Sequence, residues 1–225
     1  MSQRVRKEGL EAWFEALLIA VLLLQFAHAF VVRTFYIPSG SMEDTLLVGD
    51  YLFVNRFIYG PTLSELERNL LPVRDWDRGD IVIFHSVEEP ELDVVKRCVA
   101  LGGDTVEVSS KSLYLNGSRL EDSAYVRHKD RNVFPRPRGR PGVDTRDNFG
   151  PISVPEGHAF CFGDNRDFSR DSRVWGPLPR SHVRGRAFMI YWSNAAMRGE
   201  GPRAQERGSD ALVAPRWGRI LQVVR

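Results

Sequence analysis

The sequence predicts a mainly β protein, in which an antiparallel β-sheet domain follows one N-terminal transmembrane helix. One long apolar block lies near the N-terminus. After residue 33 the chain changes to short runs rich in Val, Ile, Phe and Tyr, broken roughly every 8–12 residues by Gly, Pro, Asn or Asp, which is typical of antiparallel β structure. With 43% hydrophobic residues among 225, the chain can bury a substantial core, so disorder along its whole length is excluded.

The apolar block covers residues 16–32 and is interrupted only by Gln25 and His28. At about 1.5 Å per residue, a helix of this length approaches the roughly 30 Å hydrocarbon core of a bilayer, and Trp13 can extend it at the interface. A transmembrane anchor at residues 10–33 is therefore feasible.

The charge before this block predicts its orientation. Residues 1–9 carry Arg4, Arg6 and Lys7, which favours a cytoplasmic N-terminus and leaves the rest of the chain outside the cytoplasm. The same features also fit a cleavable signal peptide, because Ala27-His28-Ala29 reads as an A-x-A cleavage site. A buried core helix is a third alternative, which a block apolar on all faces disfavours. The segment alone leaves anchor and signal peptide both open.

Seven later segments have the composition of β-strands. They are Tyr51–Arg56, Asp80–His85, Asp93–Ala100, Thr105–Ser109, Ser112–Leu115, Ala159–Phe162 and Arg186–Trp192. Asn116-Gly117 follows one of them and predicts a two-residue hairpin turn. Together the segments predict one extracytoplasmic β domain at residues 34–225.

Two irregular regions interrupt this domain. Between Arg127 and Arg146 there are seven basic residues, two acidic residues and three prolines, which indicates a mobile, solvated insert at about residues 127–150. Such a run could touch anionic lipid headgroups, although solvation is the commoner outcome. Residues 197–210 form a second polar linker.

Composition also excludes several classes of function. The 31 Lys and Arg residues nearly balance 29 Asp and Glu residues, giving a net charge of +2, so no nucleic-acid partner is expected. The two cysteines, Cys98 and Cys161, form no CxxC pair, so neither a disulfide-dense scaffold nor a structural zinc site is predicted. Free buried thiols are the default, and one bridge remains an alternative. The histidines lack HExxH spacing, and no Gly-x-Ser-x-Gly motif is present.

Two serines follow the apolar block in an abrupt turn. Pro38 and Gly40 favour a turn that presents Ser39 and Ser41 at its tip, with backbone N–H groups pointing outward. A serine in such a turn is usually only a turn residue, so a catalytic role needs a base nearby.

Lys96 is the candidate base. In a strand, alternation places Val94, Lys96 and Cys98 on one face and Arg97 on the other. If that face packs inward, burial lowers the pKa of the amine and lets it accept a hydroxyl proton. At an ordinary pKa of about 10.4, only about one lysine in 2,500 is neutral at pH 7, a handicap of roughly 4.6 kcal/mol. The alternative is a half-exposed lysine whose ammonium reaches water.

A third unusual segment runs from Gly163 to Arg173 and is dense in Asp, Asn, Ser and Arg. Such a composition suits an ordered, hydrogen-bonded loop, in which Ser169 could supply a hydroxyl to Lys96. Taken alone, the segment is better interpreted as a polar surface turn.

Four blocks, in this order behind one N-terminal helix, resemble bacterial type I signal peptidases. They are Ser39–Val54, Arg78–His85, Asp93–Asp104 and Gly163–Gly176. The resemblance implies antiparallel β sheets of a partly open, barrel-like form and a Ser/Lys dyad. It also favours a retained anchor, because an enzyme acting on membrane-inserted signal peptides needs its site near the bilayer, and Ser41 lies nine residues past Val32. Self-cleavage after Ala29 is a further hypothesis.

The resemblance also implies residue roles. Ser41 would be the nucleophile and Lys96 the general base; Ser39 and the Ser41 N–H would form the oxyanion hole, and Ser169 would orient Lys96. The supporting loop would be held by Asp164 and by an ion pair between Asp171 and Arg173, and Ile37, Pro38 and Val95 would line shallow pockets for small residues at −1 and −3. Two positions depart from the family pattern: Asp44 stands where Pro is usual, and Phe168 where Asn is common.

The implied function is a membrane-bound serine endopeptidase of the cytoplasmic membrane that removes signal peptides after small residues, without metal or organic cofactor. Its partners would be secretory preproteins, membrane lipid and nearby export machinery. Two alternatives are a Ser/Lys peptidase resembling self-cleaving repressors and a membrane-tethered, non-enzymatic β module that binds envelope proteins.

Overall fold

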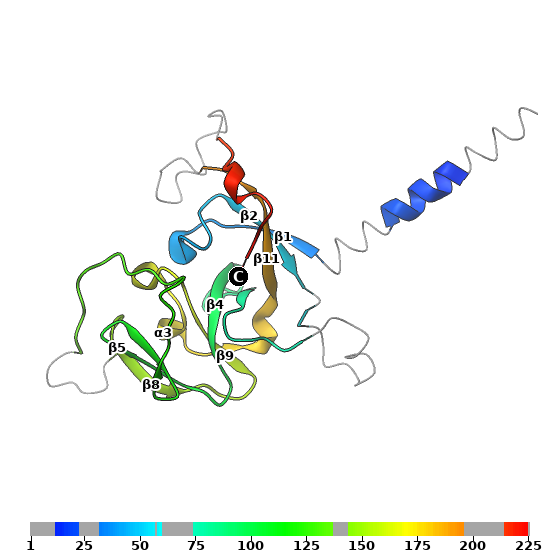
Figure 1. The fold of residues 1–225 in the computed structure, drawn as a ribbon. Coiled ribbons are helices and arrows are strands. Elements are labelled where there is room, and N and C mark those ends of the chain that lie inside the picture. Colours follow the sequence, from blue (N-terminus) through cyan, green and yellow to red (C-terminus); the bar gives the residue numbers. More distant parts are fainter. Residues whose placement is uncertain are drawn as a thin grey trace, which may run out of the picture.

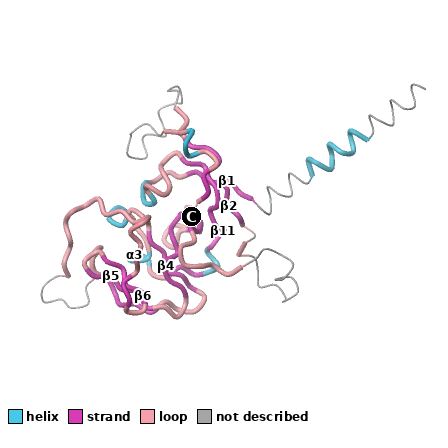
Figure 2. The backbone as a smooth tube through the Cα atoms, in the orientation of Figure 1, coloured by secondary structure: helices cyan, strands magenta, loops and turns pink. Residues whose placement is uncertain are grey.

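The computed structural model describes most of the chain. The described residues are 12–22, 32–56, 58–59, 74–136, 144–195 and 214–224. Strands far exceed helices among them, as the tube in Figure 2 shows, so the prediction of a mainly β protein is confirmed. Four predicted regions lie wholly or partly outside the described residues: the N-terminal residues 1–9, residues 10–11 and 23–31 of the anchor, 137–143 of the basic insert, and the linker 197–210.

A large antiparallel sheet forms the centre of the molecule (Figure 1). Its order is β1 (Val32–Tyr36), β2 (Asp50–Asn55), β11 (Val183–Ser193), β3 (Ile81–His85), β4 (Asp93–Leu101), β9 (His158–Phe162) and β10 (Leu178–Pro179), while β12 (Gln222–Val223) pairs with β11. The sheet is open, since β1 and β10 stand at its two ends. It brings β4 between β3 and β9, so β4 has a hydrogen-bonded neighbour on each side.

A smaller sheet of four strands lies beside it, in the order β7 (Ser118–Arg119), β6 (Ser112–Leu115), β5 (Thr105–Ser109) and β8 (Phe149–Ser153). The predicted hairpin turn joins β6 to β7: Asn116 and Gly117 both have positive φ, 53° and 79°. These angles are what a two-residue hairpin turn requires, and Asn and Gly adopt them most easily.

Short helical turns join the strands. They are η2 (Gly40–Met42), η3 (Arg166–Phe168), α3 (Ser172–Trp175), η4 (Arg180–His182) and η6 (Trp217–Arg219). The turn η2 follows β1 and contacts both β4 and η3, while α3 contacts β9, so these turns gather at the same part of the large sheet.

Strand alternation separates two of the three apolar clusters. In β4, Val95 packs with Ile81 and Ile83 in the first cluster, whereas Cys98 packs with Phe84 on the opposite face in another. Residues at even and odd positions of β4 are therefore both buried. A strand that is buried on both faces usually has a nearly continuous apolar sequence. Lys96 interrupts this apolar sequence, on the face of β4 that also carries Cys98.

All seven predicted strands are present, with ends shifted by at most three residues. Two strands of five residues escaped prediction. Strand β8 contains Pro151, which usually argues against a strand; it is tolerated because β8 lies at the edge of the small sheet.

The predicted end of the anchor is wrong by two residues. Val32 and Arg33 belong to β1 and pair with Asn55 and Val54 of β2, because the β-branched and aromatic run that begins at Val32 fits a sheet edge. The structure describes a helix at residues 12–22 before this strand. No helix among the described residues is both long and apolar enough to cross a membrane.

The basic insert differs from the expectation of simple solvation. In its described parts, Arg146 pairs with Asp130 at 3.1 Å and with Asp147 at 2.9 Å, and its guanidinium lies over the Phe134 ring. The insert also ends earlier than predicted, because β8 begins at Phe149. Acidic partners in and beside the insert thus fix side chains that the sequence suggested were free.

Candidate active site

Ser41 is held in η2 by the chain on either side of it. Before it, the Ile37 N–H donates to the Asp50 carbonyl at 2.9 Å, and after it, the Leu46 N–H donates to the Met42 carbonyl at 2.7 Å. Met42 is fully buried in the core, whereas Ser41 keeps 8% exposure. The turn therefore presents the Ser41 hydroxyl from a rigid support.

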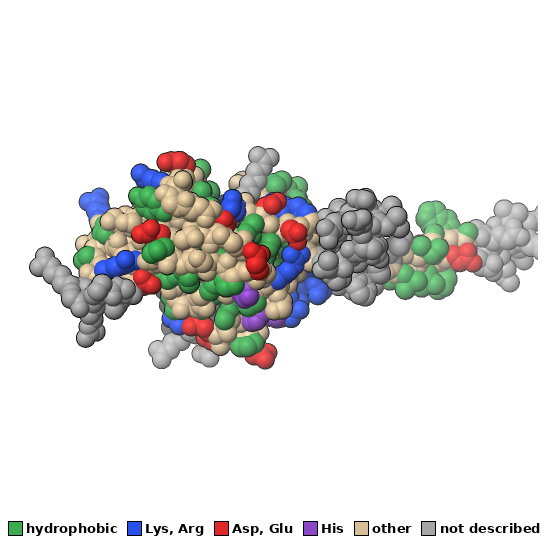
Figure 3. Space-filling view, turned by 90° about the horizontal axis from the view of Figure 1, so that it is seen from below, with side chains coloured by type: hydrophobic (Ala, Val, Ile, Leu, Met, Phe, Trp, Pro, Cys, Tyr) green, Lys and Arg blue, Asp and Glu red, His purple; other side chains and the backbone are tan. Residues whose placement is uncertain are grey.

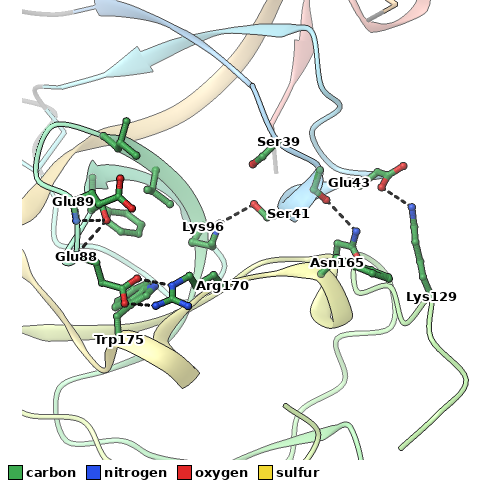
Figure 4. Close-up of a pocket in the computed structure, with 16 residues that line it drawn as sticks. Ser39, Ser41, Glu43, Glu88, Glu89, Lys96, Lys129, Asn165, Arg170 and Trp175 are labelled. Carbon is green, nitrogen blue, oxygen red and sulfur yellow. Dashed lines mark hydrogen bonds and ion pairs between the residues drawn. The ribbon is translucent and has the colours of Figure 1, made fainter. Parts of the chain in front are cut away.

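Lys96 reaches Ser41 from β4. Its Nζ donates to Ser41 Oγ at 2.7 Å and to the Val95 carbonyl at 3.1 Å, and the residue is only 3% exposed. Figure 4 shows the two side chains extending toward each other from their separate elements. The structure thus brings together two side chains that the sequence separates by 55 positions.

The surroundings of Lys96 disfavour its charged form. Burial lowers the pKa of Lys96 from its ordinary 10.5 to about 8, although the carboxylates of Asp171 and Asp164 act in the opposite direction. With a pKa of about 8, roughly one amine in ten is neutral at pH 7, instead of one in a few thousand. Most of the cost of producing a basic amine is therefore already met by the fold.

Asn165 fixes the backbone around Ser41, a role that the sequence did not reveal. Its Nδ2 donates to the Gly40 carbonyl at 3.0 Å and its backbone N–H donates to the Ser41 carbonyl at 3.1 Å. In a trans peptide the C=O and N–H groups point in opposite directions. Because the Gly40 carbonyl faces Asn165, the Ser41 N–H points away from that residue.

Ser39 lies immediately before η2, in extended backbone, and its side chain is exposed. Its hydroxyl makes no capping hydrogen bond to the turn. Ser39 and Ser41 line the same cavity, as Figure 4 shows.

Ser169 departs from the expected geometry. Its hydroxyl is buried but has no hydrogen-bond partner among the described residues, so it does not orient Lys96 by a hydrogen bond here. The hydroxyl lies close to Gly163, where a Cβ atom would come within 2.3 Å of Ser169 Oγ and 2.5 Å of the Ser41 carbonyl oxygen. Gly163 therefore packs closely against both Ser169 and the Ser41 backbone. This packing holds Ser169 at the site, but it gives Ser169 no hydrogen bond to Lys96.

The supporting loop is held by two ion pairs. Asp171 accepts from Arg173 Nε and Nη2, both at 2.8 Å. Asp164, which had no assigned partner, accepts from Arg97 Nε and Nη2 at 2.8 Å and from Thr45 Oγ1 at 2.6 Å. Asp164 therefore connects the loop both to β4 and to the chain just after η2.

Ser41 and Lys96 open onto a cavity of about 680 Å³. Phe84, Leu92 and Val94 give it apolar walls. Its charged lining residues are arranged mainly in pairs: Arg170 contacts Glu88 through two hydrogen bonds, and Lys129 pairs with Glu43 at 2.5 Å (Figure 4).

Three predicted pocket residues do not line this cavity. Ile37 is fully buried and Val95 is 6% exposed, and both belong to the first apolar cluster. Alternation along β4 places Val94 on the face of Lys96 and Val95 on the opposite face. Pro38 is exposed but lies outside the cavity lining.

The two departures from the family pattern take distinct forms. Asp44 has a positive φ of 78° and its carboxylate pairs with Arg127 of the basic insert. Phe168, by contrast, is 65% exposed and lines the cavity. Neither residue displaces Ser41 or Lys96.

Comparison with known proteins identifies the family of this chain. A family model described as "Signal peptidase, peptidase S26" matches residues 10–192. Signal peptidase I of Pseudomonas aeruginosa is 33% identical over 226 residues, covering 85% of this chain and 76% of the relative, and that of Aquifex aeolicus is 32% identical, covering 79% and 82%. A solved signal peptidase I from Enterococcus faecalis, 33% identical, covers 50% of this chain and 97% of its own, with a TM-score of 0.37. The chain therefore belongs to the signal peptidase family, peptidase S26, and is a serine peptidase.

Proposed function

We propose that this chain removes N-terminal signal peptides from exported preproteins by an acyl-enzyme mechanism that uses a Ser41/Lys96 dyad. Family membership supports signal peptides as the substrate class. The single observation that supports the dyad is the 2.7 Å contact between Lys96 Nζ and Ser41 Oγ in a site with little solvent. Membership of this family also disfavours a repressor-type peptidase and a non-enzymatic module.

The reaction begins when neutral Lys96 accepts the Ser41 proton as Ser41 Oγ attacks the carbonyl carbon of the scissile bond. The Ser41 N–H and the Ser39 hydroxyl stabilise the oxyanion of the tetrahedral intermediate. Lys96 then gives its proton to the leaving amine, and the mature protein departs. A water molecule, deprotonated by Lys96, hydrolyses the acyl-enzyme and releases the signal peptide.

Specificity for small residues before the scissile bond follows from the cavity walls. Phe84, Leu92 and Val94 enclose the side of the cavity near β4, and we assign the −1 and −3 side chains to this side. Small apolar side chains fit such walls without leaving polar groups unpaired.

We further propose that residues 10–31 anchor the enzyme in the cytoplasmic membrane, with the β domain outside the cytoplasm. The apolar block, the basic residues before it and the short distance from Val32 to Ser41 support this arrangement. Membrane lipid and the export machinery would then be its neighbours.

Cleavage of a preprotein with an A-x-A site by the detergent-solubilised full chain tests the function. Ser41→Ala and Lys96→Met are each expected to lower the rate by at least about 10³-fold, because each removes a reacting group. Matched substitutions on the exposed edge strand β7, Ser118→Ala and Arg119→Met, should leave the rate unchanged. Cleavage that persists in both dyad variants would reject the assignment.

A further inference from the structure

Cys98 and Cys161 face each other on the neighbouring strands β4 and β9 of the large sheet. The register of β4 and β9 places Cys98 directly opposite Cys161. Both side chains are fully buried, and both thiols are free in the structure. Two cysteines at one register position of neighbouring strands are a pair whose sulfur atoms can reach each other without rearrangement of the sheet.

The backbone hydrogen bonds show which kind of register position this is. The Cys98 N–H donates to the Asp80 carbonyl at 2.8 Å, and the Cys98 carbonyl accepts from the Gly79 N–H at 2.7 Å, so both groups face away from β9. The Cys161 N–H donates to Ser172 Oγ at 2.9 Å. Neither residue therefore donates to the other.

In an antiparallel ladder, two directly opposed residues that share no backbone hydrogen bond form the more closely spaced of the two kinds of pair. Its Cα atoms are typically about 4.5 Å apart, and its side chains are closer than those of the other kind. Disulfides need Cα separations of roughly 4.4–6.8 Å. A pair of this type falls within that range. In the reduced structure the Cys98 thiol donates to the Ala100 carbonyl at 3.6 Å.

We propose that Cys98 and Cys161 are joined by a disulfide when the domain folds outside the cytoplasm. The inference rests on the proposed extracytoplasmic location, because disulfides persist in oxidising compartments. The oxidant is a disulfide-bearing thiol oxidoreductase or small disulfide of that compartment. One cysteine thiolate attacks the disulfide of the oxidant, and the second cysteine displaces the oxidant from the mixed disulfide. Two protons and two electrons leave the cysteines, and the oxidant becomes a dithiol.

Burial determines when this oxidation takes place. In the folded domain both thiols are inaccessible, and burial raises the pKa of the Cys161 thiol. The reactive thiolate is therefore scarce, so the bond forms before the sheet closes over it.

The bridge would stabilise the part of the fold that carries the dyad. It would link β4, which bears Lys96, to β9, which leads into the loop after Gly163. The closed loop would contain residues 99–160, including the whole small sheet. A cross-link that closes so long a loop removes much conformational freedom from the unfolded chain.

The redox state of the exported full chain tests this proposal. Membranes are quenched with acid, denatured and treated with N-ethylmaleimide, with or without prior reduction, and the protein is digested and weighed. The proposal expects no adduct without reductant, a linked peptide pair that contains Cys98 and Cys161, and two adducts after reduction. Two adducts without reductant would overturn it.

Thermal unfolding in detergent gives a second, independent measurement. Reductant is expected to lower the midpoint of the wild-type chain by roughly 10 °C and to leave the Cys98→Ala/Cys161→Ala variant unchanged. Equal midpoints of the wild-type chain with and without reductant would contradict the bridge.

A preprotein assay on the same preparation separates this proposal from the proposed function. Cleavage by a chain with two free thiols would overturn the disulfide alone. A bridged chain that cleaves nothing would support the disulfide and reject the function.

Discussion

Lys96 is an amine enclosed among apolar atoms, and its charged form therefore opposes folding. Burial lowers the pKa of Lys96 in the folded protein to about 8, against 10.5 for an ordinary lysine. Between these two pH values the unfolded chain binds more protons than the folded chain, so stability rises with pH across this interval. Below pH 8 the full penalty is present, at about 3 kcal/mol.

Lys96→Met is therefore expected to be the more stable protein at pH 7, by up to about 3 kcal/mol. This advantage should fade as pH rises from 8 to 10.5, because the wild-type amine is then neutral in both states. Denaturant unfolding of both proteins across this range measures the difference. Two stability curves that stay parallel from pH 7 to 10.5 would contradict a lowered pKa.

Gly163 is a position where one added carbon should disable the site. A Cβ there would lie 2.5 Å from the Ser41 carbonyl oxygen, a backbone atom that cannot move without displacing the nucleophile. Gly163→Ala is expected to lower the cleavage rate by about 10²-fold or more. Gly218→Ala is the matched control, because a Cβ there meets no atom within 4 Å. Equal activity of the two variants would contradict this prediction, because it would show that η2 can shift to accommodate the added carbon without loss of function.

The sequence predicted the roles of some site residues but not of others. Period-two alternation placed Lys96 on the same face as Cys98, and the structure buries both residues. Asn165 escaped notice because its contacts join segments more than 120 positions apart, and no local pattern reports such contacts. For Ile37 the sequence could not distinguish a residue that lines the cavity from one that supports it, because an apolar residue beside a site gives the same pattern in both cases.

At the scale of elements, Arg97 and Asp164 join β4 to the loop after β9. The side chains are 3% and 1% exposed, and the two hydrogen bonds between them are bidentate. Arg97 directly follows Lys96, and Asp164 directly precedes Asn165. The ion pair therefore sets the distance between the base Lys96 and Asn165, which holds the backbone around Ser41.

Arg97→Met should destabilise the domain by roughly 3–5 kcal/mol, since it leaves a buried carboxylate without its cation. The matched control is Arg180→Met, which removes an exposed pair with Asp75 and should cost less than about 1 kcal/mol. Urea unfolding compares the two variants. Similar losses of unfolding free energy in the two variants would mean that burial does not make the Arg97–Asp164 pair more important for stability than the exposed pair.

Elements were predictable where local composition was distinctive. The seven strands with strong β character were found, and Asn116-Gly117 identified its hairpin. Strand β1 was missed because it directly follows an apolar block, and the boundary between helix and strand within one apolar run has no local signal. Strand β8 was missed because only its place at a sheet edge accommodates its proline.

At the scale of the whole molecule, the fold brings together in one site residues from sequence blocks that lie far apart in the chain. The sheet order places β4 between β3 and β9, and the turn η2 and the loop after β9 then meet over β4. Sequence predicted the fold class, but strand order depends on long-range pairing that periodicity does not encode. Figure 3 shows acidic and basic side chains interspersed over one face, as expected for a chain of net charge +2.

The central claim is that a neutral, enclosed Lys96 acts as the base for Ser41. The most direct test is the pH dependence of kcat/KM for a preprotein, which reports the pKa of the essential base in the free enzyme. If Lys96 is this base, kcat/KM rises with pH and levels off through a midpoint near 8, the pKa to which burial lowers Lys96. A midpoint near the ordinary lysine value of 10.5, or a flat profile between pH 6 and 10, would contradict it.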